Sequence, residues 1–472
     1  MAGRAKTLMS SIGFYAVSSV SARFFMFLLV PLYTFFIPPD ELGYYDVCFV
    51  TVVLLMPMMT LQMREGVLRF LISEQGEERH RQVVTYVVTV LVKTSLAAIF
   101  VTGIASLIWD VRHIWFTAAF AISLAASDVF SQVYRGLGYT KTFMVVGIIS
   151  SALIALISVV LIVIFNVGVE AIFLANIGGR VIAVAAAEIR KPILLRYFSA
   201  HIDCAEVGKE LRRFSLPLIP STVCLWMISS ANRFFIQYLL GDFDNGQFAV
   251  VLKFSAIVET LALIFYLAWQ EMAFNQYESS DRDLLYSRVL HTYVWVLAML
   301  VIGISFGARL IYPWIIGADY QVSAKYLFPL LMQSMLVLMC QFYDLGYQCA
   351  KNTKKAVPGI FAVMMLSLCC NYFLTLRFGL YGIIFTLIIS YTTLLTIRVI
   401  DTRSFFRIKI FRKSWLHIAI LAITGVLFFV ELPIWAQITT LTAALAAMLI
   451  LSPTDITILL SHLKSKFRPS AE

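Results

Sequence analysis

The chain has 472 residues, of which 60% are hydrophobic and only 14% are charged, and its formal net charge is +10. A soluble domain carries about a quarter charged residues, and one as apolar as this chain would expose patches that aggregate. The composition therefore excludes an ordinary soluble protein and indicates that lipid surrounds most of the side chains.

Long apolar runs follow one another along the chain; Thr142 to Val169 and Leu432 to Thr454 contain no Asp, Glu, Lys or Arg. About 20 such residues cross the hydrocarbon core as an α-helix, in which every backbone group is paired. We therefore predict an all-α polytopic membrane protein with about fourteen transmembrane helices. The predicted spans are 8–37, 44–70, 83–109, 112–135, 142–166, 170–194, 214–240, 246–273, 284–312, 322–350, 356–376, 379–400, 414–430 and 433–452.

Basic residues gather in one set of loops between these spans. They cluster at Arg79 and Arg81, from Arg190 to Arg213, and from Arg403 to Lys413, whereas the opposite loops hold few. Cytoplasmic loops are the ones enriched in Lys and Arg. We therefore expect a multi-pass protein of the cytoplasmic membrane with both termini cytoplasmic and an uncleaved first span. The net charge then follows from topology and gives no reason to expect a nucleic-acid partner.

The chain offers little for catalysis or cofactor binding. No predicted outer loop is long enough to hold a catalytic centre, and no nucleotide-binding motif occurs. The seven cysteines and six histidines show no metal-ligand spacing. We therefore expect no enzymatic activity, no catalytic residue, no metal and no cofactor.

Four pairs of short segments match in order at nearly constant spacing. The pairs are Ser21–Met26 with Ala231–Ile236, Glu41–Val47 with Asp244–Val250, Tyr139–Lys141 with Asn352–Lys354, and Gly168–Ile172 with Gly379–Ile383. A parallel repeat of this kind predicts two pseudo-symmetric six-helix lobes, with transport sites expected between such repeats. The expected divisions are an N-terminal lobe at 1–200, a C-terminal lobe at 201–405, and an additional helix pair with a cytoplasmic tail at 406–472.

Several motifs carry a resemblance to a known family: Ser215–Ser221 followed by Asn232–Ile236, then Ala268–Gln270, and Lys351–Lys354. With them, the chain resembles the polysaccharide transporter (Wzx-type) branch of the multidrug/oligosaccharidyl-lipid/polysaccharide exporter superfamily. The resemblance implies a bacterial flippase that serves surface polysaccharide biosynthesis by alternating access. It implies a polyprenyl-diphosphate-linked oligosaccharide as cargo. Membrane lipids, a polysaccharide polymerase and chain-length proteins are the other partners that it implies.

Charged residues at the depth of the spans are the candidate site, because each costs about 2.5–3.5 kcal/mol to insert at a helix centre. Basic side chains suit a diphosphate, to which Arg offers a fork of donors and Lys a point charge. The substrate-binding candidates are Arg23, Arg64, Lys93, Arg180, Arg233 and Lys253. The acidic candidates for proton or cation coupling are Asp128, Glu259 and Asp344.

Structural roles are open for the same residues. Arg64 and Arg398 fit snorkelling toward the membrane surface, and Arg180 fits an ion pair with Asp128 or Glu188. Each acidic candidate also fits as the partner of a buried base.

Other functions also stay open. A lipid II flippase and a multidrug-type cation-coupled antiporter belong to the same superfamily. A membrane enzyme would need a catalytic loop, and a passive scaffold would pair all its charges.

Overall fold

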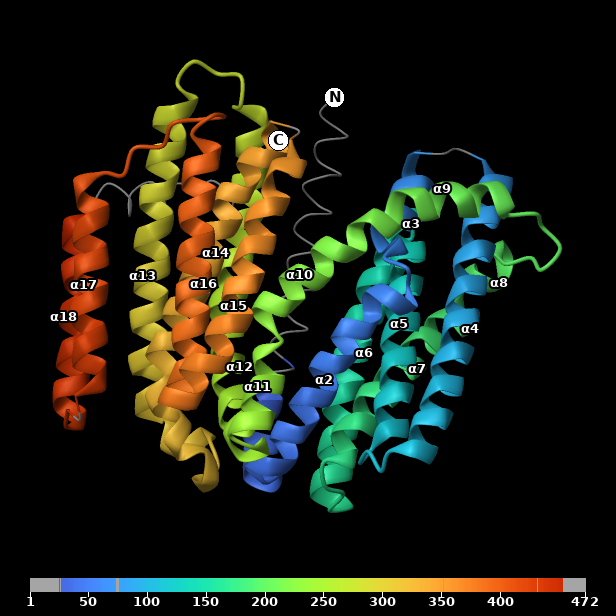
Figure 1. Cartoon of the computed structure of the whole chain (residues 1–472), viewed down its shortest axis with the longest axis horizontal. Coiled ribbons are helices and arrows are strands. Elements are labelled where there is room, and N and C mark those ends of the chain that lie inside the picture. The colour runs from blue at the N-terminus through green and yellow to red at the C-terminus, as the bar shows by residue number, and fades with distance from the viewer. Residues whose placement is uncertain (1–24, 26, 74–75, 351, 431, 453–472) are drawn as a thin grey trace, which may run out of the picture. The chain divides into compact units, whose positions relative to one another are not determined.

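The computed structural model describes residues 25, 27–73, 76–350, 352–430 and 432–452 (Figure 1). Helices dominate these residues, and no strand occurs among them. The described residues divide into two compact units, one ending at Ala249 and the other beginning at Val250, within a single helix. The predicted division at residues 200 and 405 stays a prediction.

In the first unit, helices α4 to α7 run side by side (Figure 1). The unit contains α2 (Pro39–Met59), α3 (Met63–Ser73), α4 (Glu77–Ile108), α5 (Ile114–Gly136), α6 (Thr140–Val159) with a π-helical turn (Val160–Ile164), α7 (Glu170–Arg190), α8 (Ile193–Tyr197), α9 (Ala205–Ser215), a 3-10 turn (Leu216–Leu218), α10 (Ile219–Ser229), α11 (Asn232–Leu239) and the start of α12 (Asp242–Asn275).

The second unit continues from α12 through six more long helices. They are α13 (Arg282–Ile315), α14 (Leu327–Cys349) after a 3-10 segment (Ala318–Tyr326), α15 (Val357–Phe378) after a 3-10 turn (Thr353–Ala356), α16 (Leu380–Thr402), α17 (Arg412–Phe429) and α18 (Ile434–Leu451). The last two pack against each other and against α13.

The all-helical membrane architecture predicted from the sequence is confirmed for the described residues. Twelve of their helices are long and apolar enough to cross a membrane, or thirteen if one bent pair counts as a span. The prediction of fourteen is therefore approximate. Most of the predicted first span, 8–37, lies outside the described residues.

Two predicted spans are broken rather than continuous. The span expected at 44–70 divides into α2 and α3 at a turn in which Leu61 and Gln62 have φ of 47° and 51°. The span expected at 214–240 bends by 44° where α10 gives way to α11. A hydropathy pattern records how apolar a segment is and not the direction of its axis, so neither break was predictable from it.

The starts of α2 and α12 pack directly against each other in the first unit. A Cβ atom at Gly43 would lie 1.9 Å from the Asp242 carbonyl oxygen, and one at Gly246 would lie 2.1 Å from that of Pro39. Asn245 Nδ2 also donates to the Gly43 carbonyl at 2.7 Å. Only glycine permits this approach. Gly43 and Gly246 are also the two glycines that the sequence repeat aligns.

Candidate functional site

Arg398 of α16 is neutralised within the second unit. Its Nε lies 2.7 Å from Oδ1 of Asp344 on α14, its Nη1 donates to the Ala356 carbonyl at 3.2 Å, and its guanidinium lies over the Tyr347 ring. Its side chain is only 2% exposed. The expectation that Arg398 snorkels is therefore wrong, because its charge is met by a carboxylate inside the helix packing. Asp344, a coupling candidate, is the partner of this base.

Arg233 at the start of α11 is also close to a carboxylate. Its Nε lies 3.4 Å from Oδ2 of Asp46 on α2, and its Nη1 donates to the Ser229 carbonyl and to Asn232 Oδ1. Both members of the ion pair are largely buried. Its proposed repeat counterpart, Arg23, lies outside the described residues. A role for these two arginines in cargo binding stays a prediction.

Arg64 of α3 meets Asp128 of α5, with Nη1 and Oδ1 separated by 3.2 Å. The Arg64 side chain is about half exposed, so this pair is less buried than that of Arg398. Lys253 and Glu259 lie on α12, six positions apart, and Lys253 is exposed. Cargo binding by Arg64 and Lys253, and coupling by Asp128 and Glu259, stay predictions.

Arg180 stands at the midpoint of α7 and has no carboxylate partner within the described part of the chain. Its Nη1 donates to the backbone carbonyl and to Oδ1 of Asn176, both at 2.8 Å, and its guanidinium lies over the Phe120 ring. The expected ion pair with Asp128 or Glu188 does not form. Asp128 pairs with Arg64 instead, and Glu188 accepts a hydrogen bond from Tyr134. Arg180 is thus held by neutral groups, and no described carboxylate compensates its charge.

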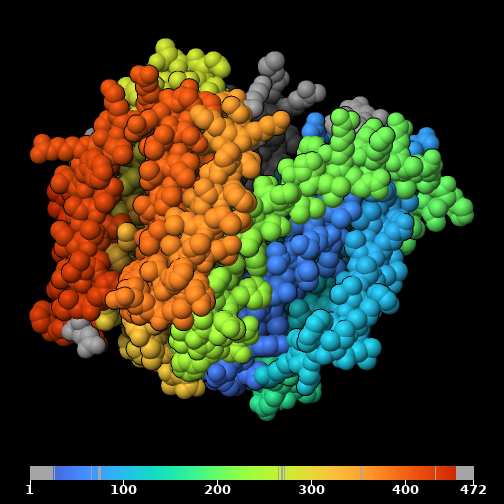
Figure 2. Space-filling model, viewed as in Figure 1, coloured from blue at the N-terminus to red at the C-terminus, as the bar shows by residue number. Residues whose placement is uncertain are grey.

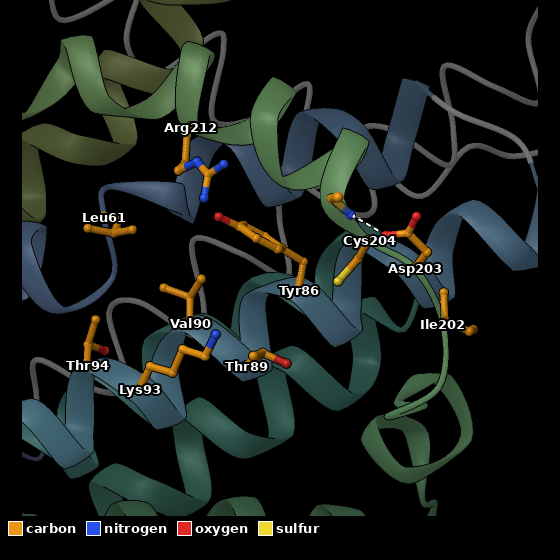
Figure 3. Close-up of a pocket in the computed structure, with 11 residues that line it drawn as sticks. Leu61, Tyr86, Thr89, Val90, Lys93, Thr94, Ile202, Asp203, Cys204 and Arg212 are labelled. Atoms are coloured by element: carbon orange, nitrogen blue, oxygen red, sulfur yellow. Dashed lines mark hydrogen bonds between the residues drawn. The ribbon is translucent and has the colours of Figure 1, made fainter.

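Lys93 lies near the midpoint of α4 and lines a pocket of about 450 Å³ (Figure 3). No ion pair or hydrogen bond engages its ammonium group among residues that the structure describes. The distance along the helix from Arg81 to Lys93 is roughly 18 Å, at about 1.5 Å per residue. That places Lys93 well inside a hydrocarbon core about 30 Å thick.

Three parts of the first unit form the walls of this pocket. One face of α4 supplies five of the eleven lining residues, the turn after α2 supplies Leu61, and α9 with the segment leading into it supplies the other five. The lining residues are Leu61, Tyr86, Thr89, Val90, Lys93, Thr94, Ile202, Asp203, Cys204, Ala205 and Arg212. We call this cavity the α4–α9 pocket.

The turn after α2 is fixed by a side chain of α4. Thr94 Oγ1 lies 2.8 Å from the carbonyl oxygen of Met59, the last residue of α2, and donates to it. Leu61 and Gln62 follow with positive φ, which L-residues rarely adopt and which costs roughly 1–2 kcal/mol per residue. The contact with Thr94 helps to hold this strained turn beside Lys93.

Helix α9 is amphipathic and lies against α4 and α3 at one end of the unit (Figure 1). Val207, Gly208 and Leu211 are buried, while Lys209 and Arg213 are exposed and Arg212 is exposed at the rim of the pocket. The chain leading into α9 and the helix itself lie on the surface in Figure 2. Because its apolar residues lie on one side only, α9 packs along the end of α4 and does not form part of a fully apolar membrane span.

Close contacts connect α9, and the segment that precedes it, to α4. A Cβ atom at Gly208 would lie 2.3 Å from the Tyr86 ring, so the helix approaches the ring edge at a glycine. The Ser199 amide donates to Thr85 Oγ1 at 3.0 Å. Arg79 Nη2 donates to Glu210 Oε2 at 2.5 Å. These contacts fix the position of Arg212. From the sequence alone, Arg212 was only one of several basic residues in a predicted linker.

The α4–α9 pocket carries more positive than negative charge. Arg212 lies over the Tyr86 ring with 5.8 Å between guanidinium carbon and ring centroid, and Lys93 extends toward the same ring from below (Figure 3). Asp203 is the one carboxylate in the lining, and its Oδ1 already accepts the Ala205 amide at 3.0 Å. The arrangement suits an anion. No cluster of three or more possible metal ligands was found among the described residues.

No protein-family model and no curated protein sequence matches this chain significantly. Solved structures, however, share its fold. The chain is similar to lipid II flippase MurJ in its inward closed conformation, with a TM-score of 0.67 at 13% identity, over 95% of this chain and 100% of that one. It is similar to an inward-facing multidrug resistance MATE family transporter of the MOP superfamily, with a TM-score of 0.65 at 14% identity, over 82% of this chain and 97% of the other.

An outward-facing MATE family transporter of the same superfamily gives a TM-score of 0.57 at 12% identity, over 84% of this chain and 95% of that one. At identities this low, the similarity shows a shared fold but does not show a shared substrate. The chain is therefore a multi-pass membrane protein with the fold of MATE family transporters and of the lipid II flippase MurJ.

Proposed function

We propose that this protein is a flippase that moves a polyprenyl-diphosphate-linked oligosaccharide across the bacterial cytoplasmic membrane by alternating access. The shared fold supports transport, and the motifs from Ser215 onward support this cargo. On this proposal the protein is not an enzyme. Its basic loops and termini face the cytoplasm, and its cargo passes on to a polysaccharide polymerase and chain-length proteins.

The observation that carries the proposal is the uncompensated charge of Arg180 and Lys93. Each stands near the middle of a membrane helix, where a basic residue costs about 2.5–3.5 kcal/mol on insertion scales. In the described residues no carboxylate pairs with either one. A diphosphate that passes through the protein would offset each charge where it meets it, since charge-assisted bonds to phosphate are about twice as strong as neutral ones.

The test is translocation by the purified full-length chain in proteoliposomes. The cargo is a polyprenyl-diphosphate oligosaccharide labelled on its sugar, and its appearance on the far leaflet is followed with an impermeant quencher. We expect Arg180→Gln and Lys93→Gln to slow translocation at least tenfold, and Arg180→Lys to restore much of it. Arg190→Gln, at the end of the same helix α7, is the matched control and should leave the rate unchanged.

Translocation at the wild-type rate by the Arg180→Gln, Lys93→Gln double variant would contradict the proposal, as would failure of the wild type to move the cargo. A lipid II flippase is the second candidate, because the likeness to MurJ extends over 95% of this chain. Translocation of lipid II alone would favour it. Export of a cationic dye without either lipid would favour a multidrug antiporter.

A further inference from the structure

We propose that the α4–α9 pocket binds the phosphate of a lipid headgroup, and that the bound headgroup ties helix α9 to α4. Two lipids carry this chemistry: an anionic phospholipid of the bilayer and a polyprenyl diphosphate. The inference rests on the proposed function only if the bound lipid is a polyprenyl diphosphate. The site adds Arg212, Tyr86 and Thr89 to the residues that the sequence nominated.

The pocket has the size of a ligand site. Its volume of about 450 Å³ lies within the range of roughly 300–1,000 Å³ that is usual for small-molecule pockets. Its lining comes from α4, from the turn after α2, and from α9 with the segment leading into it, so an occupant would touch all three.

Four donors of the pocket are unused among the described residues. Neither Lys93 nor Arg212 forms an ion pair within the part of the chain that is described, and the same holds for hydrogen bonds from the hydroxyl groups of Tyr86 and Thr89. The cation–π contact of Arg212 with the Tyr86 ring uses the face of the guanidinium and leaves its N–H groups available. Lys93 and Arg212 come from different helices and extend toward the same space beside Tyr86 (Figure 3). Two cations and two hydroxyl donors around one cavity match a phosphate group.

The surroundings favour a phosphate that is attached to a lipid. Leu61, Val90 and Ile202 give the pocket apolar walls. Beside and beyond Lys93 on α4, Val92 and Leu96 are 52% and 60% exposed. A hydrocarbon chain leaving the pocket could lie along this surface. Free phosphate would use the donors but not the apolar surface.

A bound headgroup would bridge two elements that otherwise meet through few polar contacts. Arg212 belongs to α9 and Lys93 to α4, so one phosphate between them neutralises both and links the helices. The Arg79–Glu210 pair joins the same helices at their exposed side. Occupancy of the pocket would therefore hold α9, and the chain that leads from it into α10, in the position seen here.

The binding test uses the purified full-length chain in detergent and three probes: dioctanoyl phosphatidylglycerol, farnesyl diphosphate and inorganic phosphate. Calorimetry should give at least tenfold weaker binding of the two lipid probes by Arg212→Gln and by Lys93→Gln. Arg213→Gln, the neighbouring exposed arginine of α9, is the matched control and should bind within twofold of the wild type. Arg212→Lys should recover part of the lost affinity and shows that a defect of Arg212→Gln is not misfolding.

Tighter binding of phosphatidylglycerol would identify a bilayer phospholipid, and tighter binding of farnesyl diphosphate a cargo-type lipid. No binding by the wild type, equal affinity for inorganic phosphate, or wild-type affinity in Arg212→Gln would overturn the inference. The proteoliposome assay keeps the two proposals apart. Binding without translocation of any oligosaccharide cargo would remove only the proposed function, whereas translocation without binding would remove only this site.

Discussion

Arg398 in the second unit and Lys93 in the first are both cations on long membrane helices, but their surroundings differ. Arg398 is 2% exposed, and its Nε lies 2.7 Å from Asp344 Oδ1. Lys93 opens on the α4–α9 pocket, with Arg212 as a second cation in the lining. Arg398 is paired with a carboxylate, whereas no carboxylate among the described residues forms an ion pair with Lys93.

The difference separates charges that hold the fold from charges that are available to a ligand. A buried ion pair is retained because loss of one partner leaves the other charge buried and unpaired. Such a pair can be replaced as a whole by apolar side chains with little loss. An unpaired cation in a membrane helix lowers stability and is expected to have a function instead. The two regions should therefore respond to mutation in opposite ways.

The largest effect is expected when the Arg398 pair is broken. Asp344→Ala leaves the Arg398 guanidinium buried without its carboxylate, and we expect the free energy of unfolding to fall by about 3 kcal/mol. The measurement is chemical unfolding of the purified protein in micelles. The Asp344→Ala, Arg398→Met double variant should recover most of the loss. A double variant as unstable as Asp344→Ala would show that the loss of stability does not come from leaving Arg398 unpaired.

Gly208→Ala tests whether the close packing of α9 against Tyr86 shapes the pocket. The new Cβ would lie 2.3 Å from the Tyr86 ring, so the ring or α9 must move, and Arg212 moves with it. We expect unfolding to become easier by about 2 kcal/mol, in line with overpacking elsewhere, and affinity for the lipid probes to fall. Gly303→Ala on α13 is the control, since nothing lies within 4 Å of its Cβ position. A Gly208→Ala protein with unchanged affinity would show that the ring contact does not shape the pocket.

Thr94→Val tests the turn beside Lys93 and should have a smaller effect. Valine keeps the shape but removes the donor to the Met59 carbonyl, at the end of α2. A lost hydrogen bond of this kind costs about 1 kcal/mol, and we expect that fall in the free energy of unfolding. Thr396→Val on α16 is the control, because that hydroxyl bonds only within its own helix and is exposed. Equal effects of the two variants would show that the turn does not depend on Thr94.

The sequence predicts the membrane helices well because a segment that crosses lipid must pair its own backbone groups and stay apolar over about 20 residues. Charge pairing is harder to predict. Asp344 and Arg398 lie on helices that meet only after folding, and Asp128 turned toward Arg64 rather than toward Arg180. Which of several acids meets a base depends on helix rotation, and the near-uniform hydrophobicity of these spans gives little information about rotation.

The pocket could be predicted only in part. Lys93 stands out because it interrupts an apolar run. Arg212 looks like any other residue of a basic linker, although the apolar residues Val207 and Leu211, four positions apart, indicate that this linker forms an amphipathic helix. The approach of Gly208 to Tyr86 brings Arg212 into the same pocket as Lys93, and that approach joins elements more than a hundred residues apart.

The smallest effect on stability is expected at Lys93 itself. Lys93→Met keeps the length of the side chain and removes a charge that no described residue neutralises, so the free energy of unfolding should stay within about 0.5 kcal/mol of the wild type or rise. The same micelle unfolding experiment that measures Asp344→Ala measures this change. A loss as large as that of Asp344→Ala would mean that Lys93 is a structural charge like Arg398. The two regions would then hold their cations for the same reason, and the α4–α9 pocket would no longer be distinguished by a charge that is open to a ligand.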